Sequence, residues 1–153
     1  MAKMASGSWT SEAGNDCIVA VHGRLPPSNA EWQSYCGLVF ALRNPALTKG
    51  VTFTLGGGPN AKQRATLTDI HRKLVIPVDV KGAVISDSTM VRGVITAFAW
   101  AGIAKGMRSF SARDVHAGLD YVEIAIENHP AVINLLSKLG AAIDDGNPLA
   151  VVV

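Results

Sequence analysis

The chain has 153 residues, 48% of them apolar and 17% charged, with 14 Lys and Arg against 12 Asp and Glu. This length favours one domain with a single sizeable core, and the composition excludes a disordered acidic or basic polymer. A net charge of +2 is too small to indicate nucleic-acid binding, because basic binders concentrate a larger excess on one face.

No run of about 18 apolar residues is present to span a bilayer, and residues 1–8 lack the apolar stretch of a signal peptide. Cys17 and Cys36 stand in apolar surroundings and are far apart, which favours reduced core residues over a disulfide or a zinc site. We therefore expect a cytoplasmic protein without a membrane segment.

The first part of the chain predicts a hairpin. Residues 1–8 are small and polar and predict a flexible tail. A short strand is expected over 8–12, turn residues follow at 13–16, and residues 17–22 are a strong β run.

A helix is expected next, because Ser28 and Glu31 have the spacing of a capping box and Asn44-Pro45 marks an end. Its apolar residues recur at intervals of three and four, which predicts one buried face: Trp32, Tyr35, Cys36, Val39 and Phe40.

Strands and helices then alternate. A strand is expected over 49–55, and a helix over 59–73 with Pro59 at its first position. The next strand covers 78–86 and leads into the most buried helix, which Asp87 or Ser88 caps.

A short strand over 107–110 precedes a fourth helix, for which Ser111 and Asp114 repeat the capping signature. This helix presents Val115, Leu119 and Val122 to the core.

The alternation predicts an α/β fold with a four- to five-stranded, mixed but mainly parallel sheet, flanking helices and an extra C-terminal helix. The expected core is formed by strand residues and by two residues of the buried helix: Val19, Val21, Val51, Phe53, Val84, Ile85, Ile95 and Phe98.

The extension over 124–153 contains a helical pattern up to Gly140 and an apolar tail over 149–153. The helix either covers the sheet edge of its own domain or packs on a second copy or another protein. The tail is β-prone and uncharged, so we expect it to be paired or buried.

The element order from Ser8 to about Glu123, together with the segments GGGPNAKQR and AVISDSTMVRGVITAFAW, resembles the STAS domain of anti-sigma-factor antagonists and sulphate-transporter tails. The resemblance is narrower to small bacterial STAS-like proteins related to the sporulation anti-sigma antagonist. It implies a STAS-like domain over 8–123 that regulates or scaffolds by binding protein partners and has no enzymatic activity.

The chain departs from this family at one site. In the regulated antagonists a phosphorylatable serine follows the strand that corresponds to 49–55, whereas this chain has Gly56, Gly57, Gly58, Pro59 and Asn60 there. A kinase-controlled serine switch is therefore in doubt at that position, and Thr54, Ser86 or Ser88 are weaker substitutes.

Two loops are candidate sites for a partner or an anion, because ligands of open α/β sheets gather where strands lead into helices. The first holds Gly56, Gly57, Gly58 and Asn60, with Gln63 and Arg64 one turn into the helix; its spacing is neither a dinucleotide fingerprint nor a P-loop. The second holds Ser86, Asp87, Ser88 and Arg92, which a simple helix cap would also explain.

Catalytic and metal motifs are not indicated. The four histidines, His22, His71, His116 and His129, form no metal-binding spacing and no nucleophile elbow is found, so each histidine is expected at the surface or at an element end. We expect no cofactor and no metal.

The leading hypothesis is a non-enzymatic module that binds a protein partner, with self-assembly through the C-terminal segment as a further option. The alternative is a domain that binds an anion or nucleotide at the same loops, and an unrecognised enzyme at that edge is a third.

Overall fold

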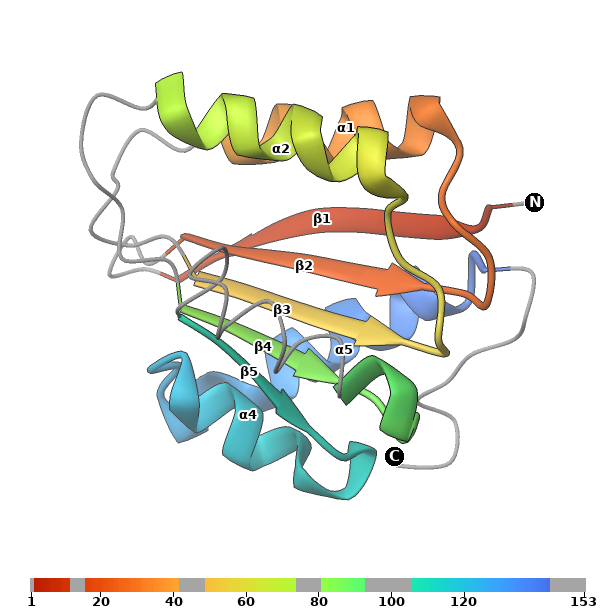
Figure 1. Ribbon diagram of the computed structural model, residues 1–153. Coiled ribbons are helices and arrows are strands. Elements are labelled where there is room, and N and C mark those ends of the chain that lie inside the picture. Colours follow the sequence, from red (N-terminus) through yellow and green to blue (C-terminus); the bar gives the residue numbers. More distant parts are fainter. Residues whose placement is uncertain (1, 12–15, 42–48, 74–80, 93–105, 144–153) are drawn as a thin grey trace.

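The computed structural model describes residues 2–11, 16–41, 49–73, 81–92 and 106–143. Within these residues five strands form one sheet in chain order (Figure 1). β1 pairs antiparallel with β2, and the remaining pairs are parallel, which confirms the predicted mixed α/β fold. The strands are β1 Met4–Thr10, β2 Asp16–His22, β3 Lys49–Thr54, β4 Lys81–Ile85 and β5 Met107–Phe110.

Helices cover both faces of the sheet (Figure 1). α1 (Asn29–Phe40) and α2 (Ala61–Lys73) lie side by side on one face, where α1 packs on β1. α4 (Val115–Tyr121) lies against β4 and β5 on the other face, and α5 (His129–Gly140) lies against β1 and β2. Residues 89–92 form the first turn of a further helix, and residues 93–105 lie outside the described residues.

The core has two layers. The larger layer lies between the sheet and the pair α4 and α5, and its strand residues include Val19, Val21, Val51, Phe53 and Ile85. These residues and Val84 are buried as predicted, whereas Ile95 and Phe98 lie outside the described residues. The smaller layer, under α1 and α2, is formed by Met4, Ala20, Trp32 and Cys36.

The N-terminal segment corrects the expectation of a flexible tail over 1–8 and a strand over 8–12. β1 starts at Met4, whose side chain is buried under α1, and ends at Thr10. The Glu31 carboxylate accepts hydrogen bonds from the backbone N–H groups of Lys3 (2.9 Å) and Met4 (3.4 Å). The small polar residues of this segment are therefore ordered by pairing with β2 and by α1.

The capping box of α1 is present as predicted, with Ser28 and Glu31 bonding each other's backbone. Trp32 and Cys36 are buried on the sheet side, but Phe40 is 64% exposed, which corrects its assignment to the buried face. Phe40 is the last residue of α1, at the end of the helix away from its cap.

The fourth helix starts later than predicted. Residues Ala112–Asp114 form a 3-10 turn, and the Ser111 hydroxyl donates to the Asp114 carboxylate (3.0 Å) instead of capping a helix. α4 then begins at Val115, and Val115, Leu119 and Val122 are buried as predicted.

The C-terminal extension packs on its own domain up to Ile143. After a 3-10 turn at Ile126–Asn128, α5 buries Val132 and Leu136 in the larger core layer. Ile143 is also buried there and forms an isolated parallel bridge with Ala2. The apolar tail over 149–153 lies outside the described residues.

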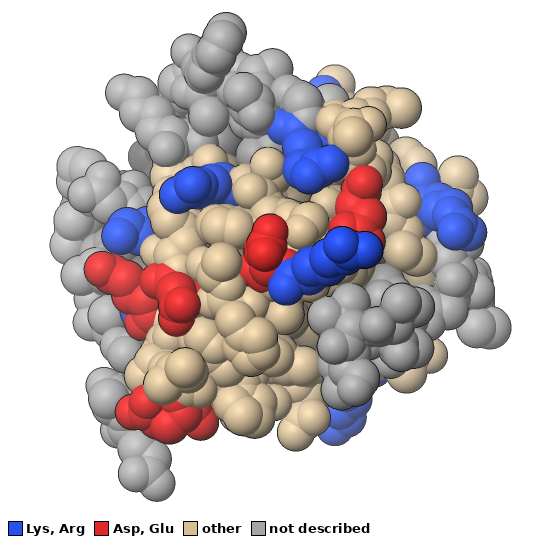
Figure 2. Space-filling view, turned by 90° about the horizontal axis from the view of Figure 1, so that it is seen from below, with Lys and Arg blue, Asp and Glu red and all other residues tan. Residues whose placement is uncertain are grey.

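Figure 2 looks onto the side of the molecule where α4 lies. Acidic and basic side chains of the described residues are interspersed on this face, without a block of one sign. This distribution is typical of an ordinary solvated face and does not resemble a nucleic-acid footprint.

Candidate functional site

The candidate site is the edge at which β2, β3, β4 and β5 end, at the right of Figure 1. We call it the carboxyl edge and define it as the loops at 23–28, 55–60, 86–88 and 111–114. Because the four strands are parallel neighbours, these loops follow one another along the sheet. Both loops singled out from the sequence belong to this edge, so the fold brings them together.

The glycine loop is packed against the loop at 23–28. The Gly57 N–H donates to the Gly23 carbonyl (2.8 Å), and a Cβ added at Gly57 would lie 2.5 Å from that same oxygen. The Thr54 hydroxyl donates to the Gly57 carbonyl (2.6 Å) and accepts from the Gly56 N–H (3.0 Å). Gly56 has φ 128°, which favours glycine, and at Gly58 no atom lies within 4 Å of an added Cβ.

The start of α2 is capped by the chain itself. The Asn60 side chain accepts from the Gln63 N–H (2.9 Å), and the Gln63 side chain accepts from the Asn60 N–H (3.0 Å). Asn60, not Pro59, therefore stands at the cap, which corrects the expected helix start. The side chains of Asn60 and Gln63, which were expected to contact an anion at this helix end, therefore hydrogen-bond backbone N–H groups of the chain itself.

Gln63 links the two helices on this face. It is buried, and its amide N–H₂ donates to the carbonyl of Pro27 (2.9 Å) and to the side chain of Asn29 (3.2 Å). The backbone carbonyl of Gln63 accepts from the indole N–H of Trp32 (2.8 Å). Gln63 is therefore a positioning residue that holds the start of α2 against the start of α1.

The hydroxyl-rich loop after β4 is held in a similar way. The buried Ser86 hydroxyl donates to the Thr54 carbonyl (2.8 Å) and accepts from the Ser88 N–H (3.2 Å). Asp87 does not cap the following helix, because its carboxylate accepts from the Ala112 N–H (3.0 Å) in the next loop. The cap is Ser88, whose hydroxyl accepts from the Val91 N–H (3.4 Å).

The residues of the carboxyl edge differ in how accessible they are to a partner. Among the residues singled out from the sequence, Gly56, Asn60, Arg64 and Asp87 are exposed, and Gly57, Gly58, Ser88 and Arg92 are half-buried. Thr54 and Ser86 are buried, so neither hydroxyl is accessible to a kinase in this conformation.

Two exposed apolar side chains at this edge were not singled out from the sequence. Leu25, in the loop after β2, is 59% exposed, and Met90, two residues after Ser88, is 78% exposed. Leu25 lies on a loop and Met90 in the first turn of the helix after Ser88, and exposed large apolar side chains beside loops held by hydrogen bonds are typical of binding surfaces. The Pro26-Pro27 pair after Leu25 was a possible signal, because it forces an extended loop before the helix cap.

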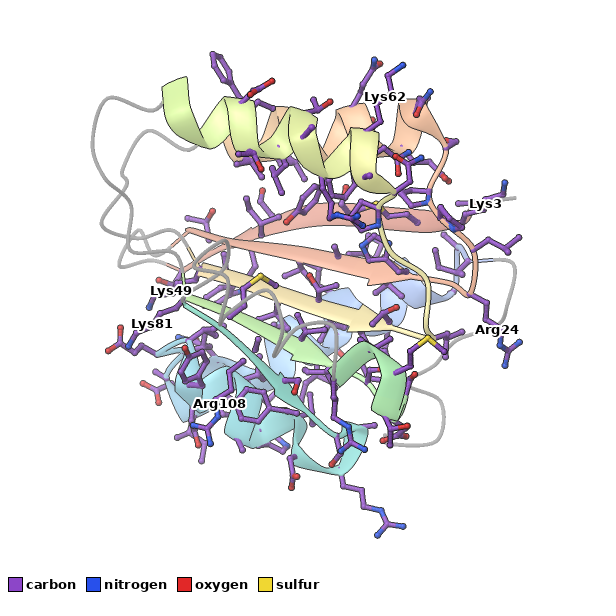
Figure 3. The ribbon with its side chains drawn as sticks, in the orientation of Figure 1. Lys3, Arg24, Lys49, Lys62, Lys81 and Arg108 are labelled. Carbon is purple, nitrogen blue, oxygen red and sulfur yellow. The ribbon has the colours of Figure 1, made fainter. Side chains whose placement is uncertain are left out.

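Cationic side chains gather at the same end. Figure 3 places Lys3 and Arg24 beside the carboxyl edge, Lys62 on the outer side of α2, and Lys49 and Lys81 at the opposite end of the sheet. The exposed Arg64 lies one turn into α2, where it donates to the Pro59 carbonyl (2.8 Å).

The carboxylates of the edge accept hydrogen bonds from their own chain. Asp87 accepts from Ala112, Asp114 from Ser111, and Glu31 from Lys3 and Ser28. Burial raises the pKa of Glu31, but its hydrogen bonds from Ser28, Lys3 and Met4 outweigh this effect and hold the pKa below its ordinary value.

His22 is the last residue of β2, in agreement with the expectation that it stands at the end of an element. Its side chain is buried, with 5% of its surface exposed. Burial lowers the pKa of its imidazole from 6.5 to about 4, against a smaller opposing effect of the Glu31 carboxylate. Its Nδ1 has no hydrogen-bond partner among the described residues. The imidazole is therefore neutral at pH 7, and it is buried next to the loop at 23–28 of the carboxyl edge.

The structure pairs two of the other histidines, which the sequence did not predict. His116 Nδ1 and His129 Nδ1 are 2.8 Å apart, and His129 Nε2 lies 2.9 Å from the Ile124 carbonyl. Because His129 Nε2 faces a carbonyl, it carries the proton, and His116 Nδ1 donates to His129 Nδ1. This pair ties α4 to the start of α5 and lies on the face away from α1 and α2.

At the opposite end of the sheet a second cluster holds the turn after α4. Lys49 donates to the Glu123 carbonyl (3.0 Å), and Lys81 Nζ is 3.5 Å from the Glu123 carboxylate. Glu123 has φ 61°, an uncommon conformation for a residue with a side chain. Lys49 and Lys81 therefore both stabilise the turn after α4.

Within the described residues, no group of three or more His, Cys, Asp or Glu side chains is placed to hold a metal ion. No helix in this part of the chain is both long and apolar enough to cross a membrane. Comparisons with protein-family models, with curated proteins and with solved structures found no match. The resemblance to the STAS domain therefore stays a prediction.

Proposed function

We propose that this chain is a non-enzymatic, STAS-like regulatory or scaffolding module that binds a protein partner through the carboxyl edge. The observation that carries the proposal is the pair of exposed side chains Leu25, on the loop after β2, and Met90, in the first helical turn after Ser88, beside loops whose backbone is held by hydrogen bonds. Apolar anchors on a rigid surface bind with little loss of conformational entropy, which suits recognition of another protein.

The polar residues of the edge support binding and not catalysis. Ser86 and Asp87 could supply a hydroxyl and a carboxylate to a reaction, but both hydrogen-bond backbone groups of neighbouring loops. Gln63 is likewise committed to joining α1 and α2. These three residues shape the surface, and the proposed partner contacts exposed side chains such as Leu25, Met90 and Arg64.

The compartment and the regulation belong to the same proposal. Cys17 and Cys36 are both free and buried, which supports a reducing, cytoplasmic environment. Of the hydroxyls of Thr54, Ser86 and Ser88, only that of the half-buried Ser88 is accessible for phosphorylation, and a phosphate there would place negative charge at the N-terminus of the helix that starts at residue 89, where backbone N–H groups favour it.

A matched set of variants tests the proposed function. Proteins captured from the native cell by the full chain are compared with those captured by Leu25→Ser with Met90→Ser, and with those captured by Phe40→Ser. Phe40 is similarly exposed, at 64%, but lies at the far end of α1. We expect a partner that binds the parent and Phe40→Ser alike and binds the double variant at least tenfold more weakly in a calorimetric titration. A partner that binds all three proteins with equal affinity would refute the proposed function.

The cationic side chains near the edge favour a second candidate, in which the loops bind an anion or a nucleotide. Thermal-shift measurements against nucleotides and phosphorylated metabolites distinguish the two. A ligand present at 100 times its dissociation constant adds about 2.7 kcal/mol of stability. A saturable shift that Arg64→Ala with Arg92→Ala abolishes would favour this candidate over a protein partner.

A further inference from the structure

We propose that His116 is a modification site of this chain, at which the ring nitrogen Nε2 takes up a phosphoryl group from another molecule. Three side chains between α4 and α5 build the site, and we call Asp120, His129 and His116 the histidine relay. Only the effect of this modification on partner binding rests on the proposed function.

His129 is the buried centre of the histidine relay. It is the first residue of α5 and is 1% exposed. Its Nε2 lies 2.9 Å from the Ile124 carbonyl oxygen and 3.3 Å from an oxygen of the Asp120 carboxylate. Its Nδ1 lies 2.8 Å from Nδ1 of His116. His129 is therefore held between oxygen acceptors on one side and a second imidazole on the other.

The contact between the two imidazoles has the geometry of a good hydrogen bond. Their ring centres are 5.1 Å apart and their planes are inclined by 22°. With the two nitrogens 2.8 Å apart, this is close to the longest separation that the ring centres can have, so both nitrogens lie near the line that joins the centres. The N–H and the lone pair of an imidazole point outward from the ring centre and therefore point at each other here.

The oxygen acceptors around His129 determine where the protons lie. Its Nε2 faces only oxygen acceptors and carries the proton, so the lone pair of the neutral ring is at Nδ1. This lone pair accepts the Nδ1–H of His116, which leaves the lone pair of neutral His116 at Nε2. His116 is exposed, and its Nε2 has no hydrogen-bond partner among the described residues. The histidine relay therefore presents a lone pair in a fixed ring at the surface.

This arrangement is typical of an activated nucleophile. Such a group has a base within about 2.6–3.2 Å and a third group that orients the base. His116 corresponds to the nucleophile, His129 to the base and Asp120 to the orienting group. Because Nε2 of His116 needs no deprotonation before it attacks, His129 acts on the proton at the other ring nitrogen.

The proposed step transfers a phosphoryl group in full balance. Nε2 of His116 forms a bond to phosphorus, and the bond from phosphorus to the leaving group of the donor breaks with its electron pair. The His116 ring becomes positively charged, and His129 removes this charge by taking the Nδ1 proton. The resulting His129 imidazolium donates to Ile124 and Asp120 through Nε2. The donor is another molecule with an activated phosphoryl group, namely an acyl phosphate or a phosphoramidate, which includes the phosphohistidine of a second protein.

The proton acceptor favours a phosphoryl group over other modifications of an imidazole. A neutral imidazole is a poorer leaving group than an imidazolium, so a phosphoryl group lasts longer on a ring whose proton has been withdrawn. An acyl group on an exposed imidazole is readily hydrolysed by water. His129 therefore helps both to form the phosphorylated ring and to preserve it.

The site has a consequence for the carboxyl edge. His116 follows the loop at 111–114 by two residues, so a phosphoryl group on it adds negative charge beside this loop. We infer that this charge changes the affinity for a partner bound at the edge. It would take over the role of the serine that the resemblance implies after β3 and that this chain lacks there.

Phosphorylation of the full chain by potassium phosphoramidate tests the site. The initial rate at each histidine is measured by mass spectrometry of the digested chain, and ³¹P NMR identifies the ring nitrogen that carries phosphorus. The variants are His116→Gln, His129→Asn and Asp120→Asn. The side-chain oxygen of His129→Asn can still accept from His116 but cannot take up a proton. Glu127→Gln is the matched control, because Glu127 is an exposed carboxylate that contacts neither histidine in the described part of the chain.

We expect His116 to be phosphorylated at Nε2 at least about tenfold faster in the folded chain than in the urea-unfolded chain. His129→Asn should slow this reaction at least about tenfold and Asp120→Asn several-fold, whereas Glu127→Gln should leave it unchanged. If His129→Asn does not fold, as judged by circular dichroism, the comparison of Asp120→Asn with Glu127→Gln decides. Attachment at Nδ1, no acceleration by folding, or equal rates in Asp120→Asn and the parent would overturn the proposal.

The tautomers provide a readout that a purely structural contact between α4 and α5 does not require. ¹⁵N NMR of the histidine rings should show the proton of neutral His116 at Nδ1 and that of His129 at Nε2. A neutral His116 with its proton at Nε2 would refute the histidine relay, because the attacking nitrogen would then have no lone pair.

Partner affinity separates this inference from the proposed function. Phosphorylated and unmodified chains are titrated against the partner, and a change of several-fold is expected. Phosphorylation of His116 with unchanged partner affinity in Leu25→Ser with Met90→Ser would refute the proposed function and leave the modification site standing. Loss of affinity in that double variant, with His116 unreactive, would refute the modification site and leave the proposed function standing.

Discussion

Gly57→Ala should destabilise the protein, because the carboxyl edge leaves no room for a methyl group at this position. An added Cβ would lie 2.5 Å from the Gly23 carbonyl oxygen and 2.6 Å from the Leu25 carbonyl oxygen. Both neighbours are backbone atoms, so the two loops must separate, and the hydrogen bond from the Gly57 N–H to Gly23 is strained with them. Forcing extra atoms into a packed site typically costs about 1–3 kcal/mol.

The neighbouring glycine provides the control. At Gly58 no atom lies within 4 Å of an added Cβ, so Gly58→Ala should be neutral or stabilise by about 0.4–1 kcal/mol through the unfolded state. A loss of 2 kcal/mol in a chain of this length lowers the melting temperature by roughly 4–8 °C. Urea denaturation and thermal melting of both variants measure the difference. Equal stability of Gly57→Ala and Gly58→Ala would show that the two loops are not in contact.

Further predictions concern two buried residues of the carboxyl edge, Ser86 and His22, and its two arginines, Arg64 and Arg92. Ser86→Ala should cost about 1–3 kcal/mol, because the Thr54 carbonyl loses its buried donor, and denaturation showing a change within 0.5 kcal/mol would contradict this role. Because the folded state holds the pKa of His22 at about 4, the unfolded chain takes up its proton first, so stability should fall as the pH drops from 6.5 to 4. The loss is of the order of 3 kcal/mol, and denaturation of His22→Gln across this range should lack it. Arg64→Ala with Arg92→Ala should change stability by no more than about 1 kcal/mol while weakening partner affinity in calorimetry.

The local signals of the sequence were sufficient for most of the framework. The Ser28 and Glu31 spacing identified the start of α1, because a capping box depends on residues three apart and needs no distant contact. The apolar run that became β2 was equally readable, and β3 was recognisable as a β-branched run in which Val51 and Phe53 alternate with Thr52 and Thr54. β1 was placed too late, because Ser6, Gly7 and Ser8 have little strand propensity of their own and are ordered by β2 and α1.

The location of the candidate site could be predicted from the sequence, but the contacts of its individual residues could not. The positions of the glycine and hydroxyl loops follow from parallel strands ending at one edge, which is a general property of the fold. Gln63 binds Pro27, which is 36 residues away in the sequence, and Asp87 binds Ala112, which is 25 residues away. No local sequence pattern could predict these two contacts. Helical spacing also could not show that Phe40, at the end of α1, is left in solvent.

The strand order of the sheet has a consequence for how the chain is made. Each strand pairs with the one before it in sequence, so the sheet can grow strand by strand as the ribosome delivers the chain. α5 is the exception, because it is synthesised after all five strands yet covers β1 and β2, the first two. Val19 and Val21 on the nascent sheet therefore lack their α5 cover until α5 has left the exit tunnel, and during this interval a chaperone has an apolar surface to bind.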